Sequence, residues 1–248
     1  CLPMQNQLAF LLLTALCLTT TLTNGAEPAT ELEAKFYRAI SRGDANAAYN
    51  QMHPAAQELA DLPVFEAWTN AVRDQLGSHV STNQTSNTRI QQLAGVEVSI
   101  ESEVVFERGT AKATMRFFDG QMVAFNVQSD QLIGWFTGPT RLEPYTEQAE
   151  AFISAFIRQD SERAWSLMHD ALKKMLPGNR LETMMQSIVD NGGSLRSLKL
   201  RDHQMVLQDD SQTLVLEYDL ECERASGECK IEFQFVGMKG HLVSFRFR

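Results

Sequence analysis

The sequence predicts an α+β protein made of two tandem copies of one domain, each with three helices followed by a curved antiparallel sheet. Residues 36–78 align without a gap with residues 152–194, at an offset of 116 that places Phe36 on Phe152 and Gly77 on Gly193. A repeat of this length is a whole small domain and not a solenoid unit. Within each copy, helical spacing of apolar residues gives way to a period of two, which is typical of strands.

The chain of 248 residues is long enough for two domains that each bury a core. We expect a first domain over residues 27–138, a linker over 139–144 and a second domain over 145–248. Two prolines in the linker, Pro139 and Pro144, should make it fairly stiff.

Each copy is expected to begin with helices. In the first copy, Phe36 and Ile40 belong to an apolar stripe, Asp44 is expected to cap a second short helix, and a third helix is expected over residues 64–76. In the second copy, Asp160 takes the place of Asp44, and the third helix is expected over 181–188. The expected strands cover 96–106, 111–117, 122–127 and 132–136 in the first copy, and 195–200, 204–207, 213–220, 230–236 and 241–247 in the second.

The order of these features resembles a known superfamily. A helix is followed by Gly-Asp or Gln-Asp, then by Ala-Tyr/Trp-x-x-Met-His, an aromatic-rich third helix, a glycine and long strands. This order is similar to the nuclear transport factor two-like superfamily, and in particular to its small exported bacterial domains of unknown function. The resemblance covers nearly all of residues 30–138 and 145–248 and implies a cystatin-like cone. Because the superfamily includes enzymes, binding modules and adaptors, the fold does not give the function.

The resemblance implies a pocket between the helices and the concave face of the sheet. The aromatic residues expected to line it are Tyr37, Trp68, Phe125 and Trp135 in the first copy, and Trp165 and Phe235 in the second. Aromatic residues at helical spacing are usually core residues, so the same side chains can instead simply fill the cone.

Two histidines occupy matching positions after the second helix of each copy. His53 and His169 are pocket candidates because a histidine can carry protons near neutral pH. They can equally cap free carbonyl groups at the end of that helix. We favour the cap, since methionine precedes each histidine where a catalytic pair would need a carboxylate or a nucleophile.

Residues 1–26 contain no charged side chain and include an apolar run from Leu8 to Leu18, which resembles a signal peptide. Export to the periplasm or the medium is therefore expected. Cys222 and Cys229 flank a turn signal between two strands, so a disulfide that clips a hairpin is expected.

The net charge of −9, without any run of Lys or Arg, argues against nucleic acid and against a membrane surface once the signal is removed. The sequence contains no catalytic triad elbow, metal-ligand cluster, phosphate loop or dinucleotide fingerprint, so neither a cofactor nor a metal is expected. We interpret the protein as an exported binding or interaction module for a small apolar ligand or an envelope protein, able to form a homodimer through its sheet faces. The alternatives are a small-molecule enzyme of isomerase, cyclase or hydrolase type, which a buried acid would favour, and a structural adaptor.

Overall fold

The chain divides into two compact units, which are described separately. The computed structural model describes residues 28–176, 178–208 and 211–248. The first unit ends at Thr140 and the second begins at Arg141. The expected signal peptide lies outside the described residues. Among the described residues, every helix is too short or too polar to traverse a lipid bilayer.

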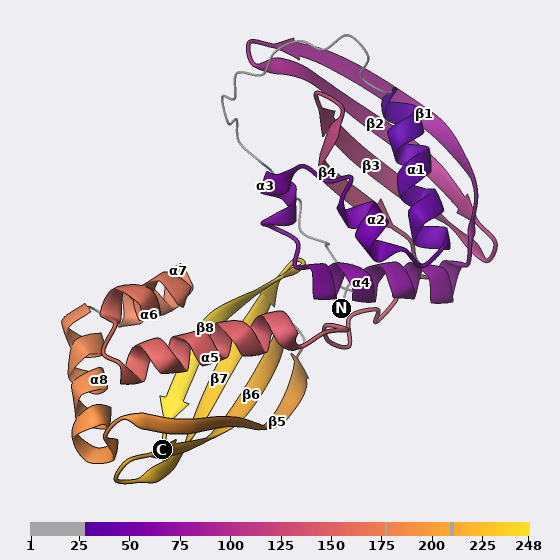
Figure 1. Cartoon of the computed structure of the whole chain (residues 1–248). Coiled ribbons are helices and arrows are strands. Elements are labelled where there is room, and N and C mark those ends of the chain that lie inside the picture. Colours follow the sequence, from indigo (N-terminus) through magenta and orange to yellow (C-terminus); the bar gives the residue numbers. More distant parts are fainter. Residues whose placement is uncertain (1–27, 177, 209–210) are drawn as a thin grey trace, which may run out of the picture. The chain divides into compact units, whose positions relative to one another are not determined.

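In the first unit, helices precede a four-stranded antiparallel meander in the order β1-β2-β3-β4. Figure 1 shows α1 lying across one face of this sheet. The helices are α1 (Ala29–Ser41), α2 (Ala45–Tyr49), α3 (Pro54–Gln57) and α4 (Leu62–Ala71), which continues into the π-helical turn η1 (Val72–Leu76). The strands are β1 (His79–Gln92), β2 (Gly95–Phe106), β3 (Gly109–Phe118) and β4 (Gln121–Gln128).

The second unit has the same order of elements and a second meander, β5-β6-β7-β8 (Figure 1). Its helices are α5 (Glu143–Ile157), α6 (Ser161–Leu167), α7 (Asp170–Met175) and α8 (Gly178–Gly192). Its strands are β5 (Leu195–Gln208), β6 (Ser211–Cys222), β7 (Ser226–Val236) and β8 (Lys239–Phe247). The α+β class and the antiparallel sheets of the prediction are therefore confirmed.

The internal repeat continues into the sheets. The offset of 116 residues carries β1 onto β5 and β2 onto β6 at both ends of each strand. The copies then diverge, because the paired strands β7 and β8 extend further before their turn than β3 and β4 do. Phe117 pairs with Met122, whereas its counterpart Phe233 pairs with Leu242.

The predicted count of three helices per unit is wrong, because each unit has four α-helices in its described residues. The additional helices, α3 and α7, are short, with four and six residues, and follow His53 and His169. Pro54 suits the first position of α3, because its missing N–H would have no partner there and its φ already fits a helix. The predicted caps are confirmed: Asp44 accepts a bond from the N–H of Ala47 at 2.9 Å, and Asp160 accepts one from the N–H of Arg163 at 3.0 Å.

Two expectations about the first sheet are wrong. Strand β1 was not expected, because residues 81–88 are all Ser, Thr, Asn or Gln and show no apolar alternation. The strand expected over 132–136 does not form. Gly134 has a φ of +57°, which breaks the extended run. The Gln75 side chain pairs with Ile133 in the place of a strand, donating to its carbonyl at 3.1 Å and accepting from its N–H at 2.9 Å.

The expected disulfide is also wrong: Cys222 and Cys229 are both free thiols. Cys229 lies opposite Tyr218 in the register of β6 and β7, four residues before Cys222. Four residues of strand span about 13 Å, far beyond the Cα separation of roughly 4.4–6.8 Å that a disulfide allows. The turn lies closer to Cys222 than the sequence suggested, so the two thiols are not level with each other.

Candidate functional site

The first unit contains an aromatic cluster that includes two of the predicted pocket residues. Trp68 on α4 and Phe125 on β4 lie with their ring centroids 5.2 Å apart. Phe36 on α1 contacts both rings, at 6.2 Å and 5.5 Å, and Phe65 joins the group. Helices and sheet therefore meet through aromatic side chains, and Trp68 is only 1% exposed.

Tyr37, a third predicted pocket residue, borders this cluster, with its ring centroid 5.6 Å from that of Phe36 in an edge-to-face contact. It is fully buried and stacks on His79 at the start of β1, with centroids 5.3 Å apart and an interplanar angle of 17°. Its ring also meets the edge of Phe106 on β2 at 6.0 Å. α1 thus places Phe36 and Tyr37 in two neighbouring parts of one interior.

The other predicted pocket residues lie elsewhere. Trp135 is half-buried in the segment after β4 and packs on Phe136 at 5.4 Å. In the second unit, Trp165 is half-buried on α6, and Phe235 on β7 packs against Tyr145 at 5.5 Å. The structure therefore brings together Trp68 and Phe125, with Tyr37 on the adjacent side of α1, and associates neither Trp135 nor Trp165 with a pocket.

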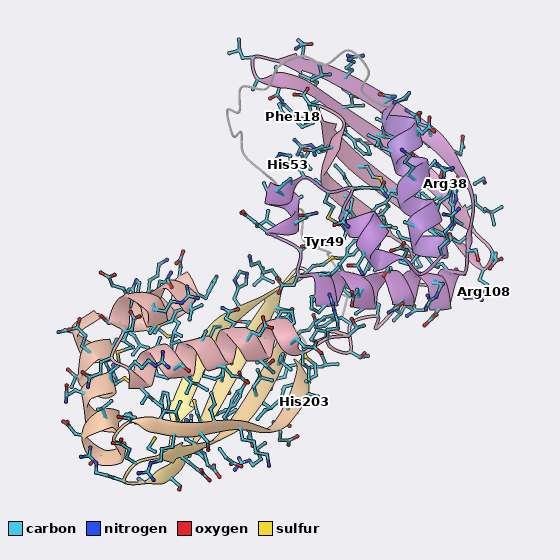
Figure 2. All side chains as sticks on the ribbon, viewed as in Figure 1. Arg38, Tyr49, His53, Arg108, Phe118 and His203 are labelled. Atoms are coloured by element: carbon cyan, nitrogen blue, oxygen red, sulfur yellow. The ribbon has the colours of Figure 1, made fainter. Side chains whose placement is uncertain are left out.

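His53 and His169 are caps, but of the helix that follows and not of the one before. The Nδ1 atom of His53 accepts a bond from the N–H of Ala55 at 3.2 Å, and Nδ1 of His169 accepts one from Ala171 at 3.3 Å. Each histidine is thus the N-cap of a short helix, so the expectation that it caps the carbonyl end of the preceding helix is wrong. Figure 2 labels Tyr49 and His53 on either side of the connection between α2 and α3.

The backbone of each histidine also ties its helices to the sheet. The N–H of His53 donates to the carbonyl of Met122 on β4 at 2.8 Å, and that of His169 donates to Leu242 on β8 at 2.9 Å. In the second unit, the His169 ring lies 4.5 Å from the ring of His241. These contacts indicate a structural role for both histidines.

The most unusual group of the first unit is a carboxylate that the sequence analysis missed. Glu33 on α1 is 2% exposed, and its Oε2 accepts a bond from the hydroxyl of Ser102 on β2 at 3.2 Å. A single acid in an amphipathic helix usually faces solvent, which is why it was overlooked. The spacing held the signal: Glu33 precedes Phe36 by three residues and Tyr37 by four, which places it on the buried face.

Burial governs the electrostatics of this group. Removal from water raises the pKa of Glu33, although the Ser102 hydrogen bond acts in the opposite direction. Burial also raises the pKa of Tyr37 well above its usual range, and the Glu33 charge adds to that effect. Both shifts favour the neutral forms, and in these forms Glu33 and Tyr37 can each donate a proton in a hydrogen bond.

Several buried polar atoms of the first unit have no hydrogen-bond partner. Among the described residues, these atoms are Oε1 of Glu33, the hydroxyl of Tyr37, Oε1 of Gln51, Nε1 of Trp68 and Oδ1 of Asn126. All of them belong to the first unit. An unpaired buried polar group costs roughly 1–3 kcal/mol, so native proteins keep few of them without a water, a ligand or a functional reason.

The second unit provides an internal comparison. At the repeat offset, Ala149 replaces Glu33, Ile153 replaces Tyr37 and Tyr218 replaces Ser102, and all three are fully buried. The Tyr218 hydroxyl has a partner, because it lies 3.5 Å from the carbonyl of Thr146. The same scaffold therefore packs without a buried acid, so the fold itself does not require Glu33.

No group of three or more His, Cys, Asp or Glu side chains in the described part of the chain is arranged to hold a metal ion. The site is thus defined by Glu33, Ser102 and Tyr37, beside an aromatic cluster that includes Trp68. These groups can hydrogen-bond a polar atom that is brought into an otherwise apolar interior.

The fold places the protein in the class of tandem α+β units with four-stranded antiparallel sheets. The chain matches no model of a known protein family and no curated protein. Among solved structures it is similar to one described as "Structure of Bdellovibrio bacteriovorus Bd1075", with 11% sequence identity and a TM-score of 0.31. That likeness covers 53% of this chain and 45% of the other, and it is too weak to support an argument about fold or function.

Proposed function

We propose that the protein is an exported binding module whose first unit holds a small, mainly apolar ligand with one polar group. The observation that carries this proposal is that Oε1 of Glu33 and the hydroxyl of Tyr37 are both buried and have no hydrogen-bond partner. A ligand oxygen placed there would accept hydrogen bonds from the Tyr37 hydroxyl and from protonated Glu33. Aromatic side chains next to these groups would contact the apolar part of the ligand.

The second unit then has a supporting role. Ala149 and Ile153 fill with apolar atoms the positions where the first unit has polar groups. The proposal therefore assigns one ligand to the chain and not two. From the order of sequence motifs, we also propose that both units belong to the nuclear transport factor two-like superfamily, with the ligand inside the cone of the first.

Export is proposed from the N-terminal segment alone. The free thiols of Cys222 and Cys229 remove the disulfide argument that pointed to an oxidising compartment. The charge-free apolar segment before residue 27 remains its support.

A solvatochromic probe tests the proposed ligand site. Prodan is neutral and mainly apolar and carries one carbonyl oxygen, so it has the proposed chemistry. We expect its emission to shift to shorter wavelength on binding, and Tyr37→Phe to weaken binding about tenfold, the value of one lost hydrogen bond. The matched control is Tyr218→Phe, which removes the hydroxyl of an equally buried tyrosine from the second unit and should leave binding unchanged. Equal losses in both variants would contradict the assignment to the first unit.

An enzyme is the second candidate, and Glu33 is the observation that favours it. A carboxylic acid with a raised pKa beside a tyrosine hydroxyl is suited to proton transfer. Mass spectrometry of a bound ligand before and after incubation with the protein separates the two functions. A binding module returns the ligand unchanged, whereas an enzyme releases a product that Glu33→Gln no longer forms.

A further inference from the structure

Strand β1 is an open edge of the first sheet. It is the outermost strand of the order β1-β2-β3-β4, and within the described residues it pairs with β2 alone (Figure 1). The backbone N–H and C=O groups on its other side are therefore available to another strand. Proteins usually protect such an edge with charged side chains, prolines or bulges.

The residues of β1 offer little protection by charge. Ser81 to Thr88 is a run of eight residues that are all Ser, Thr, Asn or Gln, and the strand contains no Lys, Asp, Glu or Pro. Arg89 is its single permanent charge. Val80 and Ile90, next to the two ends of the run, are large apolar side chains that are 61% and 51% exposed.

The matching edge of the second unit is protected. In β5, charged residues stand at positions where β1 has uncharged ones: Arg196 for Val80, Lys199 for Asn83, Arg201 for Thr85 and Asp202 for Ser86. Arg201 is held by ion pairs with Glu217 at 2.8 Å and Asp219 at 3.4 Å, and also pairs with Glu228. The two copies thus share an edge geometry but differ in the charges that would keep other strands away.

We propose that β1 pairs antiparallel with β1 of a second copy of this chain, joining the first sheets of two molecules edge to edge. A two-fold axis at Thr85 places Val80 of one copy opposite Ile90 of the other, so the two exposed apolar residues cover each other. Arg89 then lies opposite Ser81, and no like charges meet. The same arrangement of β5 about Arg201 would place two arginines opposite each other, which disfavours this association for the second unit.

The register between β1 and β2 has two irregularities, one at Val80 and one at Thr85, and neither residue has a partner on β2. The Thr85 hydroxyl donates to the carbonyl of Glu101 at 3.0 Å. The irregularity at Thr85 falls on the axis, so each copy presents one regular run before it, over 81–84, and one after it, over 86–92, with Val80 just outside the first run. The first run of one copy meets the second run of the other. This contact differs from an association through the sheet faces, and it does not depend on the ligand proposal.

Sedimentation equilibrium of the purified full chain tests the pairing. We expect a monomer–dimer equilibrium. Asn83 and Asn87 are exposed and lie opposite each other across the proposed axis, so the double variant Asn83→Lys/Asn87→Lys places like charges opposite each other twice. It should weaken the dimer about tenfold.

A charge swap and a matched control complete the design. Asn83→Lys/Asn87→Glu places opposite charges in the same positions and should restore or strengthen the dimer. The control is His203→Lys. His203, labelled in Figure 2, lies on β5 at the position that matches Asn87, and its substitution should leave the dimer unchanged. A chain that stays monomeric, or a dimer that responds equally to the Lys/Lys and Lys/Glu variants, would overturn the proposal. Circular dichroism confirms that each variant is folded.

Discussion

At the scale of single residues, burial and hydrogen bonding separate structural roles from candidate chemistry. His53 and His169 have the side chains most often used in catalysis, yet each uses its ring nitrogen to hold a backbone N–H. Glu33 attracted no notice in the sequence, yet it is the buried acid next to unpartnered groups. Residue type alone thus points to the histidines as candidate site residues and away from Glu33, because it does not reveal which side-chain atoms already have hydrogen-bond partners.

The cap assignment predicts how the histidines respond to substitution. His53→Asn should be tolerated, because an asparagine oxygen can accept the same bond from Ala55, whereas His53→Ala should cost about 1 kcal/mol of stability. The same contrast is expected for His169. Thermal melts of the four variants provide the measurement. If Asn and Ala lower the melting temperature equally at both sites, the caps do not contribute as described.

The cysteines give a second test at this scale. Burial raises the pKa of both thiols, with a further contribution at Cys222 from the charge of Glu223. We expect iodoacetamide to label Cys222 slowly in the native protein and Cys229 only after unfolding, because Cys229 is 1% exposed. Peptide mass analysis without reductant makes the comparison. A bonded pair that resists labelling even in denaturant would restore the disulfide that the register excludes.

At the scale of elements, the sequence predicts best where apolar periodicity is strong. The stripes of α1 and α5 and the alternation in β3 and β6 are visible directly in the chain. Strand β1 was missed because an edge strand needs no apolar face, and its hydrogen bonds to β2 hold it regardless of side-chain type. The segment over 132–136 was assigned as a strand because it contains apolar residues. Its Leu132 and Phe136 are indeed buried, but they belong to a loop that the Gln75 side chain holds through its two hydrogen bonds to Ile133.

One substitution can remove the hydrogen bonds between Gln75 and this loop. Gln75→Leu eliminates both bonds between the side-chain amide and Ile133, while keeping a side chain of similar size. We expect faster hydrogen exchange at the N–H of Ile133 and a modest loss of stability of about 1–2 kcal/mol. Gln131→Leu alters a neighbouring exposed glutamine and serves as the control. Unchanged exchange at Ile133 would show that other contacts hold the loop.

At the scale of the whole molecule, the duplication is the main source of inference. The aligned copies predict two domains of one fold, and in the strand register the offset of 116 residues holds as far as β3 and β7. The candidate site could not be predicted in this way, because it lies where the copies differ. Ala149 and Ile153 show that the scaffold packs well without polar groups at these positions, so Glu33 and Tyr37 are features of the first unit alone.

The first unit contains a buried acid, Glu33, at a position that the second unit fills with Ala149. Because burial raises the pKa of Glu33 above its ordinary value of 4.5, the unfolded chain loses this proton at a lower pH than the folded chain does. The contribution of protonated Glu33 to the free energy of unfolding is therefore fully present below pH 4.5. It is lost as the pH rises through the raised pKa, because the buried side chain then becomes charged.

Calorimetry of the wild type and Glu33→Gln at pH 4 and pH 8 tests whether this acid is buried in the first unit, with Glu150→Gln on the exposed face of α5 as the control. Glutamine keeps the shape and the acceptor for Ser102 but cannot ionise. We predict that Glu33→Gln stabilises one of two unfolding transitions at pH 8, has little effect on it at pH 4, and leaves the other transition unchanged at both values. An equal shift at the two pH values, or a shift in both transitions, would contradict the account.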